Sequence, residues 1–357
     1  MIPEKTVCVT GASGFIASHI VNQLLAEGYR VRGTVRKSPE HYPYLLQLPG
    51  AGERLELVEA DLLRSESFIP AFIECACVIH TASPYIINVK DPQTDLVKPA
   101  LEGTSAVMEA ALKTSGLKRL VLTSSVAAIT DEPDSSKVFT EHDWNTRSSL
   151  QRHPYHYSKT LAERAAWDFI DRKKPDFDLI TINPAMVTGP SVGSGLNTTN
   201  AMIRDIMNGV YPGIMDINWG FVDVRDTARA HILAMEKVSA RGRYLCSAEV
   251  IDMRELVELL SLSGYGNYPL PKRDLTNIFG TALMKTLSWT QPRDTGTYLR
   301  THIGRSIRYE CSKIEKELGI EFRPVRESIL EAVEDMISKG HLDRRDKKSS
   351  AARRKKY

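Results

Sequence analysis

A tyrosine, a lysine and a serine in the first half of the chain have the types and spacing needed for proton transfer to a carbonyl group. Tyr155 and Lys159 are four residues apart, and Ser125 lies 30 residues before the tyrosine, at the end of an apolar run. On a helix, residues i and i+4 share a face, so the ammonium would stabilise the phenolate and lower the phenol pKa. Such a phenol donates a proton near neutral pH, while the serine hydroxyl holds the substrate oxygen.

Two nearby residues are weaker candidates for acid–base chemistry. Tyr157 has no lysine four residues beyond it, and His80 stands at the end of a predicted strand, where a structural role is expected. The alternative interpretation is that Tyr155 is an aromatic side chain at a packing interface and that Lys159 is a solvated surface charge. We predict that Ser125, Tyr155 and Lys159 are the catalytic residues.

A glycine-rich turn close to the start of the chain predicts a dinucleotide site. It follows a β-branched run and opens a helical pattern, with the spacing Gly-x-x-Gly-x-x-Ala. Such a turn lets the backbone approach a pyrophosphate, whose charge then lies at the positive end of the helix. The alternative is a turn used only for tight packing. The predicted cofactor contacts here are Gly11, Ser13, Gly14, Phe15 and Ile16.

The end of the second predicted strand favours NADPH over NADH. NAD sites usually place an acidic residue there, but this chain has Arg36 and Lys37, whose charges suit a 2′-phosphate. The alternative is ordinary surface charge. Asp61 and Leu62 follow the third strand, where an aspartate can accept a hydrogen bond from the adenine amino group; a helix N-cap is the competing interpretation.

These residues require a parallel sheet to bring them together. Short apolar runs alternate with amphipathic stretches in the first half, which is typical of successive βα units in an α/β fold. We predict a Rossmann-type, doubly wound parallel sheet in residues 1–185, to which residues 221–237 return. Residues 186–220 and 238–343 should form a smaller mixed α/β lobe that binds substrate. The predicted elements are strands at 6–10, 31–35, 55–59, 77–80, 120–123 and 179–183, and helices at 15–27, 96–115, 155–172, 253–261 and 327–339.

Composition indicates a globular protein, and the positive net charge of the chain comes from its last residues alone. The 357 residues have a net charge of +3, but residues 344–357 hold eight basic residues and one acidic residue, so the rest of the chain is at −4. This argues against nucleic-acid binding. We expect the tail to be a disordered, solvated terminus; a nuclear-localisation or acidic-surface patch is the alternative. Five scattered cysteines, no signal-like start and no apolar run of membrane length favour a cytoplasmic protein with no metal site.

Several segments in matching order resemble the extended short-chain dehydrogenases/reductases. Within that superfamily the chain resembles the dihydroflavonol reductase and cinnamoyl-CoA reductase branch, with its fungal aldehyde and methylglyoxal reductase relatives. The segments that carry the resemblance are 9–17, 31–36, 80–84, 155–159, 183–190 and 221–226.

The resemblance implies roles for particular residues. Ser125, Tyr155 and Lys159 match the catalytic serine, tyrosine and lysine, and the lysine would also hold the nicotinamide ribose. Arg36 matches the 2′-phosphate ligand. Glu102 stands where many relatives place asparagine, which puts a proton-relay water at that side chain in doubt. The residues expected beside the cofactor are Thr81, Ala82 and Ser83, and those expected to support the nicotinamide are Pro184 and Val187.

The combined prediction is an NADPH-dependent carbonyl reductase acting on an aldehyde or ketone. The predicted pocket is mostly apolar, which favours a hydrophobic or aromatic substrate. Alternatives are a nucleotide-sugar epimerase or dehydratase, a 3β-hydroxysteroid dehydrogenase, and a non-catalytic NADP(H)-sensing protein. Expected partners are a small carbonyl compound and, at most, a second copy in a homodimer. The predicted pocket residues are Tyr85, Ser125, Met186, Trp219 and Phe221.

Overall fold

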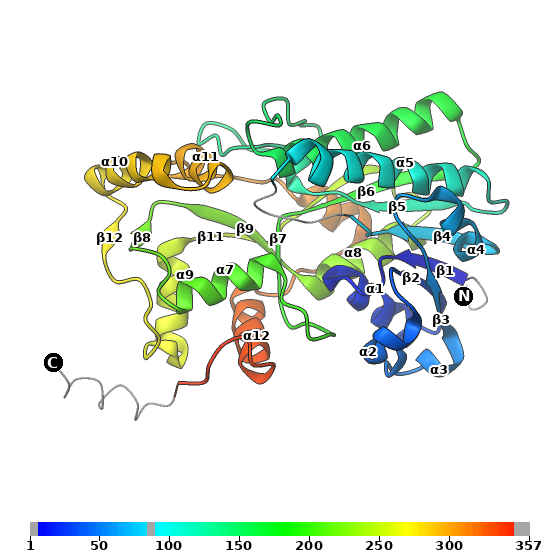
Figure 1. Cartoon of the computed structure of the whole chain (residues 1–357), viewed down its shortest axis with the longest axis horizontal. Helices are drawn as coiled ribbons and strands as arrows, with labels where there is room; N and C mark the ends of the chain where they lie inside the picture. Colours follow the sequence, from blue (N-terminus) through cyan, green and yellow to red (C-terminus); the bar gives the residue numbers. More distant parts are fainter. Residues whose placement is uncertain (1–5, 84–89, 346–357) are drawn as a thin grey trace.

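Seven parallel strands form the central sheet of the protein (Figure 1). The computed structural model describes residues 6–83 and 90–345. Because the inner strands β1, β4 and β5 are buried under helices on both faces, their sequences are largely continuous apolar runs. Their spatial order is β10-β6-β5-β4-β1-β2-β3. The strands are β1 (Thr6–Thr10), β2 (Arg30–Val35), β3 (Leu55–Glu59), β4 (Cys75–His80), β5 (Arg119–Thr123), β6 (Asp178–Pro184) and β10 (Gly242–Cys246).

Two pairs of helices cover the faces of this sheet (Figure 1). Helices α1 (Phe15–Ala26) and α8 (Val224–Glu236) pack together on one face, and α5 (Lys98–Leu112) and α6 (Pro154–Lys173) on the other. Each face buries its own apolar cluster. The chain order of strands β1 to β6 reverses between β1 and β4, so the carboxyl edge opens a crevice at that point.

Short helical turns connect the main elements of the Rossmann domain. Three are α-helical: α2 (Pro43–Leu46), α3 (Ala51–Arg54) and α4 (Ile69–Phe72). The remaining turns, including those in the second lobe, are 3₁₀ or π turns: η1 (Pro39–His41), η2 (Ser65–Phe68), η3 (Gln93–Val97), η4 (Val126–Ala128), η5 (Ser261–Tyr265), η6 (Ser288–Thr290) and η7 (Ile314–Leu318).

The second lobe is built on two small sheets and has its own apolar core. The sheet β11-β9-β7 contains β7 (Met186–Thr188), β9 (Asn218–Asp223) and β11 (Glu249–Asp252), and β8 (Ile214–Met215) pairs with β12 (Asp274–Leu275). Its helices are α7 (Thr198–Met207), α9 (Met253–Leu260), α10 (Ile278–Leu287), α11 (Arg293–His302) and α12 (Val325–Ser338). A capping box in which Asp252 and Glu255 bond each other's backbone starts α9.

The predicted fold class is confirmed, and the predicted strands and helices agree with the structure to within a few residues at their ends. Of the predicted return of residues 221–237, Val224–Glu236 form α8, which packs on α1, whereas residues 221–223 belong to β9 in the second lobe's sheet. One boundary was wrong: Gly242–Cys246 was assigned to the second lobe but pairs with β6 as an edge strand of the main sheet. This run is too short for its sequence to show which sheet it joins.

The first two residues of the predicted tail contact the folded body. Arg344 lies 3.7 Å from Glu334, and the guanidinium of Arg345 lies 5.3 Å from the ring centre of Tyr268. The rest of the predicted tail, residues 346–357, is outside the described residues. Among the residues that are described, no helix is long and apolar enough to cross a membrane.

Candidate active site

The carboxyl ends of β1, β4, β5 and β6 bring the predicted site segments to one edge of the sheet. The glycine turn follows β1, Thr81 to Ser83 follow β4, and Ser125 follows β5. Helix α6 presents Tyr155 and Lys159 on the covering layer. Since parallel strands end at a common edge, residues more than 100 positions apart in the sequence meet here.

The glycine turn has the geometry required for a pyrophosphate. Gly11 has a φ of 65°, and a Cβ at this position would lie 3.0 Å from the backbone of Ala82. Helix α1 begins after Gly14, without a side-chain cap and without an acidic residue in its first turn. Its first backbone N–H groups therefore have no helical acceptor and suit an anion. Tyr44 holds the turn by donating a hydrogen bond to the Ser13 carbonyl (3.0 Å).

The basic residues at the end of β2 separate into a structural arginine and two exposed cations. Arg32 pairs with Glu56 at 2.7 Å and donates to the Ile73 carbonyl at 2.7 Å, so its guanidinium is already engaged. Arg36 and Lys37 lie beyond the end of the strand and are exposed. Their position beside the glycine turn suits a 2′-phosphate, so the residues present fit NADPH.

Asp61 and Leu62 have local structural roles at this edge. The Asp61 carboxylate accepts a hydrogen bond from the Leu63 N–H (3.0 Å), which closes a turn after β3. The Leu62 side chain fills the space beside Gly103 on α5. The competing interpretation of Asp61 as a helix N-cap is wrong, because the N-cap of the helical turn that follows, η2, is Arg64. The adenine contact of Asp61 stays a prediction.

The Thr81–Ser83 segment connects the nucleotide turn with the lysine on α6. The Thr81 hydroxyl donates to the Thr10 carbonyl (2.5 Å), and the Ala82 N–H donates to the Thr10 hydroxyl (3.2 Å). Two residues further, the Ser83 hydroxyl accepts a hydrogen bond from Lys159 Nζ at 3.0 Å. A cofactor on the glycine turn would thus extend along this segment toward Lys159.

Lys159 is a buried cation. Burial lowers its pKa from 10.5 to about 8, and the opposite charge of Glu163, one turn further along α6, works against this shift. Its Nζ lies 6.0 Å from the centre of the Tyr155 ring. A cation close to a phenol favours its phenolate form, as the predicted proton transfer requires.

Ser125 lies two residues after the end of β5, and Tyr155 lies in the first turn of α6. Ser125 is extended (φ −165°) and caps η4, with its Oγ accepting the Ala127 N–H at 3.1 Å. Helix α6 begins at Pro154, after His153 in a left-handed conformation (φ 51°). The proline at the first helical position sets this start, so Tyr155 falls in the first turn with Lys159 on the same side.

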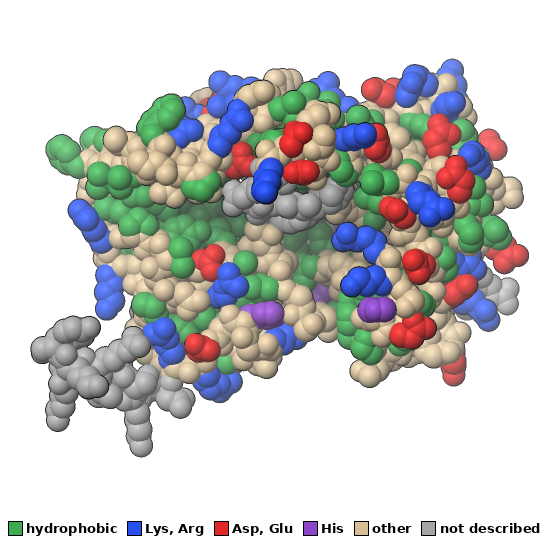
Figure 2. Space-filling model, in the orientation of Figure 1, with side chains coloured by type: hydrophobic (Ala, Val, Ile, Leu, Met, Phe, Trp, Pro, Cys, Tyr) green, Lys and Arg blue, Asp and Glu red, His purple; other side chains and the backbone are tan. Residues whose placement is uncertain are grey.

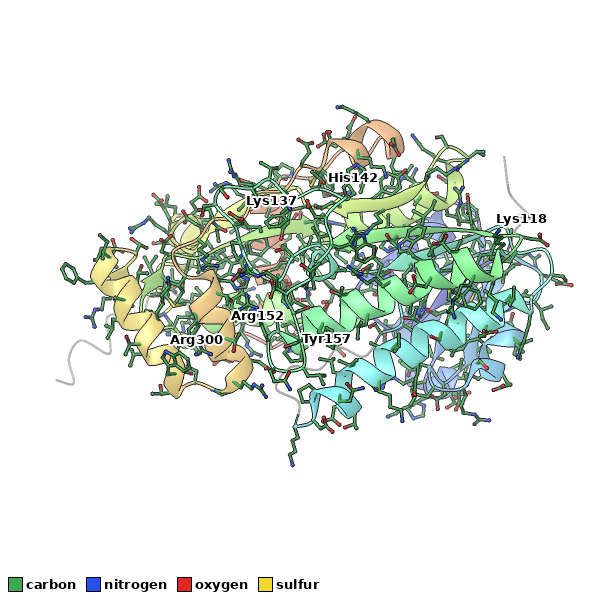
Figure 3. All side chains as sticks on the ribbon, turned by 90° about the horizontal axis from the view of Figure 1, so that it is seen from above. Lys118, Lys137, His142, Arg152, Tyr157 and Arg300 are labelled. Carbon is green, nitrogen blue, oxygen red and sulfur yellow. The ribbon has the colours of Figure 1, made fainter. Side chains whose placement is uncertain are left out.

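The structure also shows where Tyr157 and His80, the weaker candidates for acid–base chemistry, lie. Tyr157 is two residues from Tyr155 and projects about 200° round the helix from it; Figure 3 labels it at the amino-terminal end of α6. His80 is buried against the Thr10 hydroxyl (2.7 Å), and burial lowers its pKa to about 3. Glu102 is exposed and lies 3.8 Å from Lys98, so its side chain faces solvent.

The predicted pocket residues differ in how much of each side chain is exposed and so accessible to a substrate. Met186 is half-buried on β7, whereas Trp219 is 6% exposed and donates through Nε1 to the Tyr298 hydroxyl at 2.9 Å. Phe221 has no exposed surface and belongs to the core of the second lobe. Tyr85 lies outside the described residues. Figure 2 shows a hollow lined with hydrophobic side chains below α10 and α11, in agreement with an apolar binding region.

The two residues predicted to support the nicotinamide, Pro184 and Val187, lie at the end of β6 and on β7. Pro184 is buried and pairs with Cys246 across to β10, and Val187 is 8% exposed on β7. Both lie where the main sheet passes into the second lobe. In the described residues no group of three or more histidine, cysteine or acidic side chains could hold a metal ion.

Sequence reasoning missed three residues that lie behind the catalytic segment. Glu163 is buried one turn after Lys159, Asn183 is buried near the end of β6, and Arg243 comes from the unforeseen strand β10. Asn183 Nδ2 donates to the Ser125 carbonyl (3.1 Å) and to Glu163 (2.8 Å). The sequence did contain a sign of Glu163: it lies four residues after Lys159, so it shares that residue's face of a helix that packs on the sheet.

A doubly wound parallel sheet with a glycine turn at its switch point and a tyrosine–lysine pair at the same edge defines a dinucleotide-dependent dehydrogenase or reductase. The pattern of the NAD dependent epimerase/dehydratase family matches residues 7–246. The chain belongs to this family, and the predicted membership of the extended short-chain dehydrogenases/reductases is confirmed.

Relatives cover nearly the whole chain. A cinnamoyl-CoA reductase of Medicago truncatula is 40% identical over 346 residues, covering 94% of this chain and 96% of the relative. Tetraketide alpha-pyrone reductase 1 of Arabidopsis thaliana is 36% identical, with the same coverage of 94% and 96%. The structure of Gre2 from Candida albicans in complex with NADPH has a TM-score of 0.78 at 31% identity, covering 94% of this chain and 99% of that one.

Proposed function

We propose that this protein is an NADPH-dependent carbonyl reductase that converts a hydrophobic or aromatic aldehyde or ketone to an alcohol. The observation that carries the proposal is the Tyr155–Lys159 pair on α6, which meets Ser83 and Ser125 at the carboxyl edge of the sheet. The relatives are reductases, and Gre2 structures contain NADPH. Both the predicted activity and the predicted cofactor agree with these relatives.

The protein's own residues would polarise and protonate the substrate. NADPH, when bound, supplies the hydride. Tyr155 gives its phenolic proton to the carbonyl oxygen, and the ammonium of Lys159 stabilises the phenolate that results. The Ser125 hydroxyl donates a hydrogen bond to the same oxygen and so polarises the carbonyl. The segment from Gly11 to Ile16, together with Arg36 and Lys37, would hold the phosphates.

The apolar surroundings support an uncharged substrate. Met186 is hydrophobic, and the hollow of Figure 2 is lined mostly with hydrophobic side chains, which suit an uncharged group better than a nucleotide sugar. The exposed cations beyond β2 favour a 2′-phosphate, which counts against the NAD-using sugar enzymes. A redox sensor without turnover would not need the catalytic trio, and this counts against the non-catalytic alternative.

The test follows NADPH oxidation with a panel of carbonyl compounds. The panel contains cinnamoyl-CoA, methylglyoxal, isovaleraldehyde and vestitone, which the names of the relatives suggest, and a nucleotide sugar as the negative member. We expect turnover of an apolar carbonyl and none of the sugar. Binding of NADPH without turnover of any carbonyl compound would favour the sensor.

We further infer a cytoplasmic location and a monomeric or homodimeric state. All five cysteines are free thiols, which fits a reducing compartment. Microscopy of a fluorescent fusion tests the location, and light scattering coupled to size-exclusion chromatography tests the state. Fluorescence in an organelle, or a mass above that of a dimer, would contradict this inference.

A further inference from the structure

A carboxylate buried behind the catalytic segment has hydrogen-bond donors on both of its oxygens. Glu163 is 1% exposed in the middle of α6. Its Oε1 accepts from Arg243 Nε (2.6 Å), the Thr181 hydroxyl (3.1 Å) and Trp167 Nε1 (3.4 Å). Its Oε2 accepts from the Ser124 hydroxyl (2.5 Å), Asn183 Nδ2 (2.8 Å) and, at 3.3 Å, the same arginine. Each carboxylate oxygen therefore has at least three hydrogen-bond donors around it, and none of these partners comes from solvent.

The two oxygens face different parts of the protein. Oε2 faces the end of β5, because Ser124 directly precedes Ser125 and Asn183 Nδ2 also donates to the Ser125 carbonyl at 3.1 Å. The Ser124 N–H donates to the Ile182 carbonyl (2.8 Å), so the segment is bound to β6 as well. The carboxylate therefore ties the catalytic serine's backbone to the helix that carries Tyr155 and Lys159.

Arg243 balances the charge of Glu163 without entering the site. Its guanidinium donates to the carbonyls of Glu141 (2.8 Å) and Asp143 (2.6 Å) and lies 3.8 Å from the centre of the Trp144 ring. A buried ion pair is seldom more stable than an apolar pair of the same size. Stability alone therefore does not explain well why Glu163 and Arg243 are buried as an ion pair. The hydrogen bonds of Glu163 Oε2 to Ser124 and Asn183 suggest a second role for the carboxylate.

We propose that Glu163 is a positioning residue for carbonyl reduction, holding Ser125 at a fixed place relative to Tyr155 and Lys159 through Ser124 and Asn183. This inference rests on the proposed function, because it assumes that those three residues act on one carbonyl oxygen. Glu163 itself touches no substrate. Its effect is geometric, and a misplacement of about 1 Å at a reacting group costs roughly 10²-fold in rate.

Two substitutions and one control test the proposal. Glu163→Gln places an amide N–H₂ against donors, so we expect kcat to fall about 10²-fold, with the Kd for NADPH changed less than about threefold. Ser124→Ala keeps the Glu163–Arg243 pair intact and removes one donor from Oε2; we expect a kcat loss of about tenfold. The matched control, Trp167→Phe, removes one donor from Oε1 and should leave kcat within about twofold of the parent enzyme.

Hydrogen exchange provides a readout that does not depend on activity. The Ala127 and Ala128 N–H groups donate to the Ser125 hydroxyl and carbonyl, so their exchange reports how firmly the segment is held. We expect faster exchange in residues 124–130 with Ser124→Ala and with folded Glu163→Gln, and parent-like exchange with Trp167→Phe. Melting temperatures identify any variant that fails to fold, and Ser124→Ala then carries the test.

The outcomes separate this inference from the proposed function. Equal kcat and equal exchange for Ser124→Ala and Trp167→Phe would overturn the positioning role, whatever their melting temperatures. A parent enzyme that reduces no carbonyl compound would overturn the proposed function and, with it, the catalytic part of this inference. In that case the exchange data still decide whether Glu163 holds the Ser125 segment.

Discussion

Replacing Lys159 by methionine should make the protein without cofactor more stable at neutral pH while abolishing reduction. The side chain is buried, and its pKa falls from 10.5 to about 8 because burial penalises the ammonium. A folded-state pKa below the unfolded value means that the folded protein binds its proton less tightly. The parent is therefore destabilised where the lysine is charged in both states, and regains stability as the pH rises from about 8 toward 10.5.

The magnitude follows from the two pKa values. At 1.36 kcal/mol for each factor of ten, the shift corresponds to roughly 3 kcal/mol at neutral pH. Methionine has a similar length and no charge, but it loses the hydrogen bond to Ser83, worth about 1 kcal/mol. We expect Lys159→Met to raise the free energy of unfolding by about 2 kcal/mol near pH 7 and by close to zero near pH 10.

The assay is urea unfolding of both proteins across this pH range, without NADPH. The difference between variant and parent isolates Lys159, because the other titrating groups are common to both. Lys173→Met is the control: this lysine is exposed near the end of the same helix, so its replacement should change stability by less than about 0.5 kcal/mol. A less stable Lys159→Met at neutral pH, or a difference that does not change with pH, would refute this reasoning.

Three further predictions test the remaining parts of the site. Tyr155→Phe should lower kcat by ~10² to 10⁴ with NADPH binding nearly intact, and Tyr157→Phe should have far less effect; equal losses would contradict the assignment. Arg36→Ala should raise the Kd for NADPH about tenfold, less at high salt, and leave the Kd for NADH unchanged, as fluorescence titration of both cofactors will show. A chain ending at Arg345 should keep full activity and melting temperature, because it retains the described contacts of Arg344 and Arg345 with the body; a drop of several degrees would count against this.

The Rossmann domain was predictable because its signals are local. A strand buried on both faces must be apolar along most of its length, as Val7 to Val9 and Leu120 to Leu122 are, and helix α1 follows the first of these strands directly after the glycine turn. The glycine turn and the Tyr155–Lys159 spacing are local as well. Their meeting at one edge then follows from the parallel order of the strands, without knowledge of any side-chain contact.

The second lobe was less predictable because its pairing is long-range. Strands β8 and β12 have two residues each and are separated by more than 50 residues, so neither has a periodicity of its own. Phe221 shows the same limit within the site: its sequence neighbours suggested a pocket wall, but β9 alternates its side chains and the position is fully buried. Which face of a short strand meets solvent depends on packing that the sequence does not show.

The two arginines of β2 show how the end of a strand selects the functional residue. Arg32 is inside the strand, where its neighbours on β3 and the turn after α4 supply Glu56 and the Ile73 carbonyl, and these partners hold its guanidinium. Arg36 is the first residue after the strand, where the sheet no longer supplies partners and the glycine turn lies alongside. Since both residues are arginine, composition cannot distinguish them; their distance from the strand end does. The same rule applies to Ser124 and Ser125: the first is buried on Glu163, and the second, one residue further, has its hydroxyl at the edge where substrate would bind.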